Sequence, residues 1–210
     1  MRNKDQFQGA RFELCVTACL IVAGFEIDYE DEGDTLRKHA EFIAKDSSGQ
    51  MFAVEAKSRH REDVLDYKSG HWQSGNKRES NHRPQVENIL RKALAKEPAN
   101  PYLVFIDVNL PHNNELAEGN PWFTEITDTV KKISAEPFER GFPANAIFFC
   151  NDPTHQMLDE IPPGKNFWCY GMPIEKAARP LRDVGTLTRD IVQATWRRTN
   201  FPNEFPAEDR

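Results

Sequence analysis

The clearest alternation of hydrophobic and polar positions lies in residues 37–59, which read RKHAEFIAKDSSGQMFAVEAKSR. Two segments rich in Phe, Ile, Val and Ala, residues 39–46 and 50–58, flank the short loop Ser47-Ser48-Gly49. Gly49 can take the positive φ that closes a three-residue hairpin loop. The pattern therefore predicts a β-hairpin.

The loop length sets which residues face each other. A three-residue loop pairs Asp46 with Gln50 and places Glu41 opposite Glu55. Period-2 alternation then gives one apolar face, made of Ala40, Phe42, Ala44, Phe52, Val54 and Ala56. The other face carries Glu41, Ile43, Ala53, Glu55 and Lys57. A two-residue loop would send Glu41 and Glu55 to opposite faces. We prefer the three-residue loop because it leaves one face wholly apolar.

Two facing carboxylates destabilise a hairpin unless they bind a cation. On an antiparallel pair their Cβ atoms lie about 4.5–5.5 Å apart and the charges repel each other. Carboxylate oxygens are the hard ligands that Mg²⁺ prefers, so a divalent cation between Glu41 and Glu55 would reverse the interaction. Lys57 would then hold a water nucleophile or stabilise a phosphorane-like charge. The alternative is an amphipathic hairpin with solvated charges.

Glu41 followed by Glu55-Ala56-Lys57 resembles the PD-(D/E)xK signature of the restriction-endonuclease-like nuclease superfamily. The resemblance extends in element order over residues 7–110, and Ala40-Glu41 stands where the family usually has Pro-Asp. It implies a phosphodiesterase site in which Glu41, Glu55 and the main-chain carbonyl of Ala56 hold Mg²⁺ or Mn²⁺. Lys57 would be its catalytic lysine.

The resemblance implies two further site residues. Glu13, on the helix before the hairpin, would complete the metal site, although it can equally be a glutamate on the helix surface. Gln85, which opens the next helix, would approach the same site.

A basic segment follows the hairpin. Residues 57–83 contain seven Lys or Arg and three His against four acidic residues. A basic loop of this kind is well placed to bind the phosphate backbone of a nucleic acid. The alternative is a solvated loop without a binding role. The candidate nucleic-acid contacts are Arg59, Arg61, Lys68, Lys77, Arg78 and Arg83.

The remaining pattern predicts the fold. Helices are expected at residues 5–23 (ended by Gly24), 84–97, 122–134 and 181–198; further strands at 25–30, 102–108, 146–150 and 167–170. This order gives an α/β (α+β) protein with an α-β-β-β-α-β core, a mixed sheet flanked by helices, as in the restriction-endonuclease-like fold. We expect one domain at residues 1–199 and a flexible tail at 200–210.

Composition narrows the function classes. The chain has 210 residues and a formal net charge of −6, which argues against a strongly electrostatic, non-specific nucleic-acid binder and makes any basic patch a local one. The four cysteines form no C-x-x-C motif and are expected to be reduced core residues. The apolar run near the N-terminus is too short to span a membrane. We therefore expect a cytoplasmic protein without membrane contact.

These observations favour a Mg²⁺- or Mn²⁺-dependent endonuclease that cuts DNA, or less readily RNA, in bacterial defence or DNA processing. The sequence contains no helix-turn-helix or zinc-finger motif, so targeting would need a homodimer or a protein partner. The alternative is a catalytically silent nuclease fold that serves as a binding or scaffold subunit of a multi-protein complex.

Overall fold

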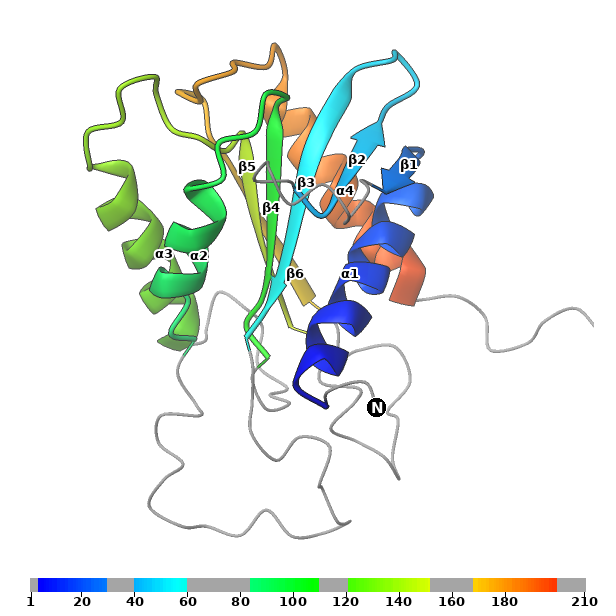
Figure 1. Cartoon of the computed structure of the whole chain (residues 1–210), viewed down its shortest axis with the longest axis horizontal. Helices are drawn as coiled ribbons and strands as arrows, with labels where there is room; N and C mark the ends of the chain where they lie inside the picture. Colours follow the sequence, from blue (N-terminus) through cyan, green and yellow to red (C-terminus); the bar gives the residue numbers. More distant parts are fainter. Residues whose placement is uncertain (1–3, 30–39, 60–83, 110–120, 152–167, 200–210) are drawn as a thin grey trace, which may run out of the picture.

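A computed structural model describes residues 4–29, 40–59, 84–109, 121–151 and 168–199 (Figure 1). They form a six-stranded mixed sheet with helices on both faces, so the predicted α/β class is confirmed. The elements are α1 Lys4–Val22, β1 Glu26–Tyr29, β2 Phe42–Lys45, β3 Met51–Ser58, α2 Glu87–Leu94, β4 Tyr102–Asp107, α3 Pro121–Ser134, β5 Ala146–Asn151, β6 Trp168–Pro173 and α4 Val184–Thr199.

The strands lie in sequence order across the sheet. β1, β2 and β3 form an antiparallel meander, β3, β4 and β5 are parallel, and β6 returns antiparallel at the edge. Every residue of β4 and β5 is buried. This burial explains their near-continuous apolar sequences, because helices cover both faces of the sheet where these strands run.

The sheet separates two hydrophobic cores. The first packs α1 and α4 on one face, around Phe12, Leu20, Phe42, Phe52 and Ile191. The second packs α2 and α3 on the other face; among its members are Ala53, Leu90, Tyr102, Ile126 and Phe149. Figure 1 shows these two helical layers on opposite sides of the strands.

The hairpin has the predicted register. Ala44 pairs with Phe52, and the N–H of Asp46 donates to the carbonyl of Gln50 at 3.0 Å. Gly49 closes the loop with φ +86°, the conformation that a three-residue loop requires. Ala40 is the one error in the predicted apolar face: it joins the α2/α3 core. β2 begins only at residue 42, so strand alternation does not extend to Ala40.

Helix ends follow local chemistry. α1 ends as predicted at Gly24, whose φ is +91°, with hydrogen bonds from Gly24 N to Ile21 O and from Phe25 N to Leu20 O. α2 is shorter than the predicted 84–97 because Gln85 (φ 47°) and Glu97 (φ 44°) have left-handed backbones, which a right-handed helix excludes. Gln85 therefore precedes the helix.

α4 starts at Val184 rather than at the predicted residue 181. The carboxylate of Asp183 accepts a hydrogen bond from the N–H of Thr186 at 3.1 Å, which is the N-cap arrangement. The predicted tail at 200–210 lies outside the described residues.

The cysteines are free thiols, as expected for a reduced protein. Three of them, Cys19, Cys150 and Cys169, are buried, whereas Cys15 is half-buried and so is only partly a core residue.

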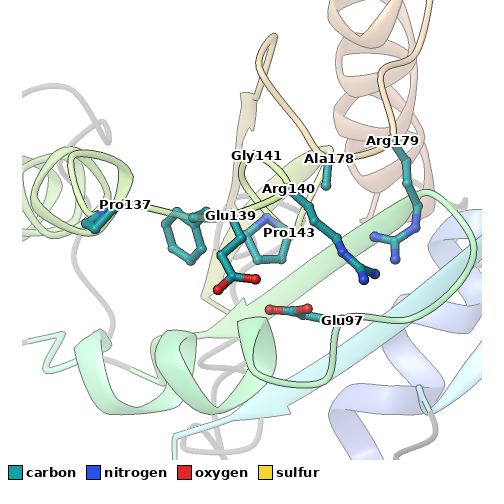
Figure 2. A pocket seen from close by; sticks show the side chains of 9 residues that line it. Glu97, Pro137, Glu139, Arg140, Gly141, Pro143, Ala178 and Arg179 are labelled. Atoms are coloured by element: carbon teal, nitrogen blue, oxygen red, sulfur yellow. The ribbon is translucent and has the colours of Figure 1, made fainter.

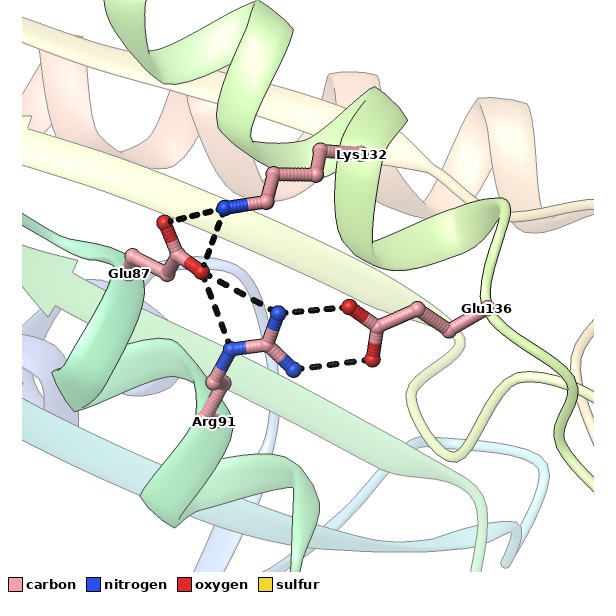
Figure 3. A network of polar contacts seen from close by, with 4 residues as sticks. All are labelled: Glu87, Arg91, Lys132 and Glu136. Atoms are coloured by element: carbon pink, nitrogen blue, oxygen red, sulfur yellow. Dashed lines mark hydrogen bonds and ion pairs between the residues drawn. The ribbon is translucent and has the colours of Figure 1, made fainter.

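An ion network joins the outer surfaces of α2 and α3 (Figure 3). Arg91 donates to Glu87 at 3.1 Å and to Glu136 at 2.8 Å, and Lys132 donates to Glu87 at 2.9 Å. All four side chains are at least a third exposed. Exposed ion pairs contribute little to the free energy of unfolding. Substitutions in this network are therefore suitable controls for substitutions of buried charged groups.

The loop of the hairpin generates a prediction about stability. The carboxylate of Asp46 accepts hydrogen bonds from Ser48 N (2.8 Å), Ser48 Oγ (2.6 Å) and Gln50 N (3.0 Å). Slight burial opposes the charged form, but these donors outweigh it and lower the pKa of Asp46. Asp46→Ala should lower the free energy of unfolding by about 1 kcal/mol near pH 7, measured by urea denaturation.

The contribution of the Asp46 carboxylate to stability should depend on pH. A carboxyl group whose pKa is lowered by folding stabilises the native state above its unfolded pKa, and that stabilisation is lost as the pH falls through the lowered pKa. The difference between wild type and Asp46→Ala should therefore shrink in strong acid. Asp28→Ala, an exposed carboxylate on β1, is the control. A difference that stays constant with pH would contradict the assigned role of the charge.

Candidate functional site

Glu41 and Glu55 lie on the same side of the sheet. Glu41 directly precedes β2, and its N–H donates at 2.9 Å to the carbonyl of Val54, the residue that pairs with Phe42. Both carboxylates contact Lys57, so the Glu41 side chain lies on the side of the sheet that carries Glu55. Along β3, Val54 packs in the α1/α4 core and Ala53 in the α2/α3 core. Alternation therefore directs Glu55 and Lys57 toward the α2 side.

Lys57 bridges the two carboxylates. Its Nζ donates a hydrogen bond to Oε1 of Glu41 and lies 3.1 Å from Oε1 of Glu55. The structure thus brings together the three residues on which the sequence hypothesis depends. Their proximity results from the hairpin register and the spacing of two residues between Glu55 and Lys57.

A second lysine completes the cluster. Nζ of Lys96 lies 2.7 Å from Oε2 of Glu55 and 3.6 Å from Oε1 of Glu41. We call Glu41, Glu55, Lys57 and Lys96 the carboxylate–lysine cluster. Lys96 was not among the predicted site residues, because its contact with Glu55, 41 residues earlier in the sequence, depends on how α2 packs against β3. The only signal was a lysine near the end of the helix that follows the E-x-K strand.

Glu55 is the buried centre of the cluster. Its side chain is 0% exposed, whereas those of Glu41, Lys57 and Lys96 are 24%, 36% and 23% exposed. Both Glu55 oxygens are within ion-pair distance of a lysine, but neither accepts a hydrogen bond of ordinary geometry from the described residues. Burial raises the pKa of Glu55, and the two lysines offset that rise only in part. Burial also opposes the charge of Lys57, yet Glu55 and Glu41 outweigh it and raise its pKa.

The donor set fits a divalent cation in part. Glu41 and Glu55 supply hard oxygens, and the Glu55 oxygens have unused hydrogen-bonding capacity. Ala56 separates Glu55 from Lys57, and its methyl group packs in the α1/α4 core; the role of its carbonyl stays a prediction. The described residues contain no group of three or more His, Cys, Asp or Glu that could hold a metal ion.

Glu13 is therefore not grouped with the two carboxylates. It lies on α1, whose buried face packs against the side of the sheet opposite the cluster. A glutamate on that helix was the expected third acidic residue, and the alternative of a helix-surface position agrees better with its half-buried state.

Gln85 contacts Arg59 instead of the cluster. Its Oε1 accepts from Nη2 of Arg59 at 3.2 Å, and its N–H donates to Glu125 at 3.3 Å. Arg59 is only 8% exposed, and burial lowers its pKa, a change that Glu125 partly offsets. A buried guanidinium is poorly placed for an exposed phosphate backbone, so the expected role of Arg59 is not supported. The other expected nucleic-acid contacts lie outside the described residues: Arg61, Lys68, Lys77, Arg78 and Arg83.

A buried polar group anchors the end of β3. Asp107, at the end of β4, accepts hydrogen bonds from Ser58 Oγ (3.0 Å) and Asn109 N (2.9 Å). The side-chain amide of Asn109 donates to Gln8 of α1 (2.8 Å) and to the carbonyl of Arg59 (2.9 Å). These contacts fix the backbone directly after Lys57, and no local sequence pattern indicated them.

A surface pocket of about 390 Å³ lies between the turn after α2 and the segment after α3 (Figure 2). Glu97, which follows Lys96 in sequence, lines it together with Glu139, Arg140 and Arg179. Figure 2 shows these four side chains pointing into one space. Two carboxylates and two guanidinium groups balance each other, so the lining favours neither an anion nor a cation.

Comparisons with known proteins add no family assignment. No protein-family model matches the sequence. Searches of curated proteins and of solved structures also found no match. The resemblance to nucleases therefore rests on Glu41, Glu55, Lys57 and the order of the elements.

Among the helices that the structure describes, none combines the length and the apolar character needed to cross a membrane.

The burial of Glu55 generates a prediction about pH. A carboxyl group whose pKa is raised by folding binds its proton more tightly in the native state, so its ionisation costs stability as the pH rises from the unfolded pKa through the folded pKa. Glu55→Gln resembles the protonated form and avoids this cost. Without divalent metal, the stability of wild type relative to Glu55→Gln should therefore be lower near pH 7 than near pH 4.

Urea denaturation in EDTA at both pH values measures the difference. Glu87→Gln, which removes a carboxylate from the surface ion network of Figure 3, is the matched control. If wild type instead became more stable relative to Glu55→Gln as the pH rises, the attraction of the two lysines would outweigh the cost of burying the Glu55 carboxylate.

Proposed function

We propose that the protein is a metal-dependent nuclease that hydrolyses phosphodiester bonds, in DNA more readily than in RNA. The observation that carries the proposal is the meeting of Glu41, Glu55 and Lys57 on one side of two adjacent strands, with Lys57 within ion-pair distance of both carboxylates. Two adjacent carboxylates offer hard oxygen ligands on one side of the sheet. They are what a phosphodiesterase needs to bind a divalent ion.

The chain's own residues have separate roles. Glu41 and Glu55 would hold Mg²⁺ or Mn²⁺, with the carbonyl of Ala56 as a further ligand. The bound ion would polarise the phosphoryl group and lower the pKa of a bound water. Lys57 would orient that water or neutralise charge on the phosphorane, since its carboxylate neighbours favour the protonated ammonium. The contacts of Asp107 would keep the end of β3, and with it Lys57, in place.

The topology supports a restriction-endonuclease-like arrangement. One helix precedes an antiparallel β1–β2–β3 meander, and α2 connects β3 to the parallel strand β4. This is the α-β-β-β-α-β order on which the family resemblance depends. The E-x-K residues lie on the third strand of the meander, as that resemblance requires.

The substrate and setting are proposed on weaker grounds. The basic segment that follows β3 supports a nucleic-acid substrate, through Arg61, Lys68, Lys77, Arg78 and Arg83. A small nuclease without a specificity motif suits bacterial defence or DNA processing in the cytoplasm, with a homodimer or a protein partner for targeting. This part rests on family-level analogy.

A second candidate function has an observation in its favour. In the cluster, two ammonium groups already neutralise the two carboxylates, and no third acidic group joins them within the described part of the chain. A catalytically silent nuclease fold, acting as a scaffold subunit, would have this composition. It predicts nucleic-acid or protein binding that is insensitive to divalent metal.

A cleavage assay tests the proposal. Purified protein is incubated with supercoiled plasmid, single-stranded DNA and RNA in Mg²⁺, Mn²⁺ or EDTA. We expect metal-dependent cutting that falls by about 100-fold or more in Glu55→Gln and Lys57→Met, because each removes a group that acts on the transition state. Glu87→Gln and Lys92→Met are controls, since they change the same residue types on α2 outside the cluster.

Circular dichroism and thermal melts establish that every variant is folded. Cutting that persists in EDTA or in Lys57→Met would refute the assigned chemistry. No cutting by wild type with any substrate would favour the scaffold function.

A further inference from the structure

Lys96 has the same relation to the two carboxylates as Lys57, although it comes from a different part of the chain. It approaches Oε2 of Glu55 at 2.7 Å, while Lys57 approaches Oε1 at 3.1 Å. Each lysine also lies within ion-pair distance of Oε1 of Glu41. The positions from which a divalent ion could reach both carboxylates are thus shared between two ammonium groups.

The two lysines differ in how firmly the backbone holds them. Lys57 lies within β3, which pairs with β4 along its length, and the hydrogen bond between Ser58 and Asp107 fixes the following residue. Lys96 lies after the end of α2, in a turn held by its N–H to the carbonyl of Ala93 at 3.1 Å. Because Lys96 lies outside every helix and strand, its backbone can shift away from Glu55 without breaking a strand pairing.

We propose that Lys96 is a second lysine of the active site, which neutralises Glu55 in the metal-free protein and is displaced from it when Mg²⁺ or Mn²⁺ binds. The released ammonium then contacts the phosphate of the substrate. This inference rests on the proposed nuclease function.

The charges of the cluster support the exchange. Two carboxylates and two ammonium groups leave the metal-free cluster neutral. A divalent ion would make it doubly positive if both lysines stayed, and like charges packed within a few ångströms repel strongly at a partly buried position. Moving Lys96 away from Glu55 relieves that repulsion. A phosphodiester carries one negative charge and is a natural new partner for the displaced ammonium.

The exchange predicts competition between Lys96 and metal. Lys96→Met keeps a side chain of similar length but removes the charge, so it should bind Mn²⁺ about tenfold or more tightly than wild type. Isothermal titration calorimetry with Mn²⁺ and no nucleic acid measures this directly. Lys96→Arg retains a cation and should bind Mn²⁺ no more tightly than wild type.

Lys92→Met is the matched control, because it removes an exposed charge of the same kind from α2. If Lys92→Met strengthens Mn²⁺ binding as much as Lys96→Met does, the effect is general electrostatics and the proposal fails. If Lys96→Met binds Mn²⁺ no more tightly than wild type, including no binding at all, displacement is excluded.

Thermal melts with and without Mn²⁺ distinguish the exchange of Lys96 for metal from a purely structural role of this lysine. Lys96→Met leaves buried Glu55 with one lysine, so it should melt below wild type in EDTA and gain more from Mn²⁺ than wild type gains. Destabilisation of equal size with and without Mn²⁺ would indicate a purely structural lysine and overturn the proposal.

The cleavage assay distinguishes the role of Lys96 from the proposed nuclease function. In the nuclease assay, Lys96→Met should reach half-maximal rate at lower Mg²⁺ but show a reduced maximal rate, because the phosphate contact is lost. An unchanged Mg²⁺ requirement would overturn the role of Lys96 while leaving the nuclease function intact. Wild type that binds Mn²⁺ in competition with Lys96 but cuts no nucleic acid would refute the nuclease function alone.

Discussion

The register of the β2–β3 hairpin is the constraint on which the site depends. The loop closed by Gly49 pairs Asp46 with Gln50 and Phe42 with Val54. Glu41 precedes this pairing directly, and its carboxylate meets that of Glu55 at Lys57. A shift of β2 by one residue would turn its side chains to the opposite face of the sheet. It would move Phe42 and Ala44 out of the α1/α4 core, so the packing of that core holds the register of the hairpin. The stability of the fold and the geometry of the site thus share one cause.

The unfavourable burial of charge in this arrangement concerns Glu55. A fully buried carboxylate requires partners, and here they are ammonium groups rather than main-chain or hydroxyl donors. Such pairing compensates charge but leaves the oxygens without well-formed hydrogen bonds, which is a weak way to stabilise a core. The same property suits a site whose partners must change when a divalent ion arrives. Local instability of this kind is expected at functional positions.

The sequence predicted the parts of the structure that depend on local pattern. Alternation along residues 39–58 predicted the two strands, the loop and their pairing, because each follows from a period of two and one glycine. Ala40 was assigned to the wrong face because it lies before the strand begins. Lys96 and the Asp107 contacts could not be predicted, since they depend on how α2, β3 and β4 pack in three dimensions. Gln85 was misplaced because no local pattern showed that its backbone is left-handed and that its side chain lies against Arg59.

The central claim is that Glu41 and Glu55 form a divalent-metal site. The most direct measurement is an anomalous difference map, at the manganese absorption edge, from crystals grown with Mn²⁺. We expect a peak between the two carboxylates, with Lys57 still beside them and Lys96 turned away from Glu55. A map without a peak at this position, in which both lysines remain in contact with the carboxylates, would contradict the account.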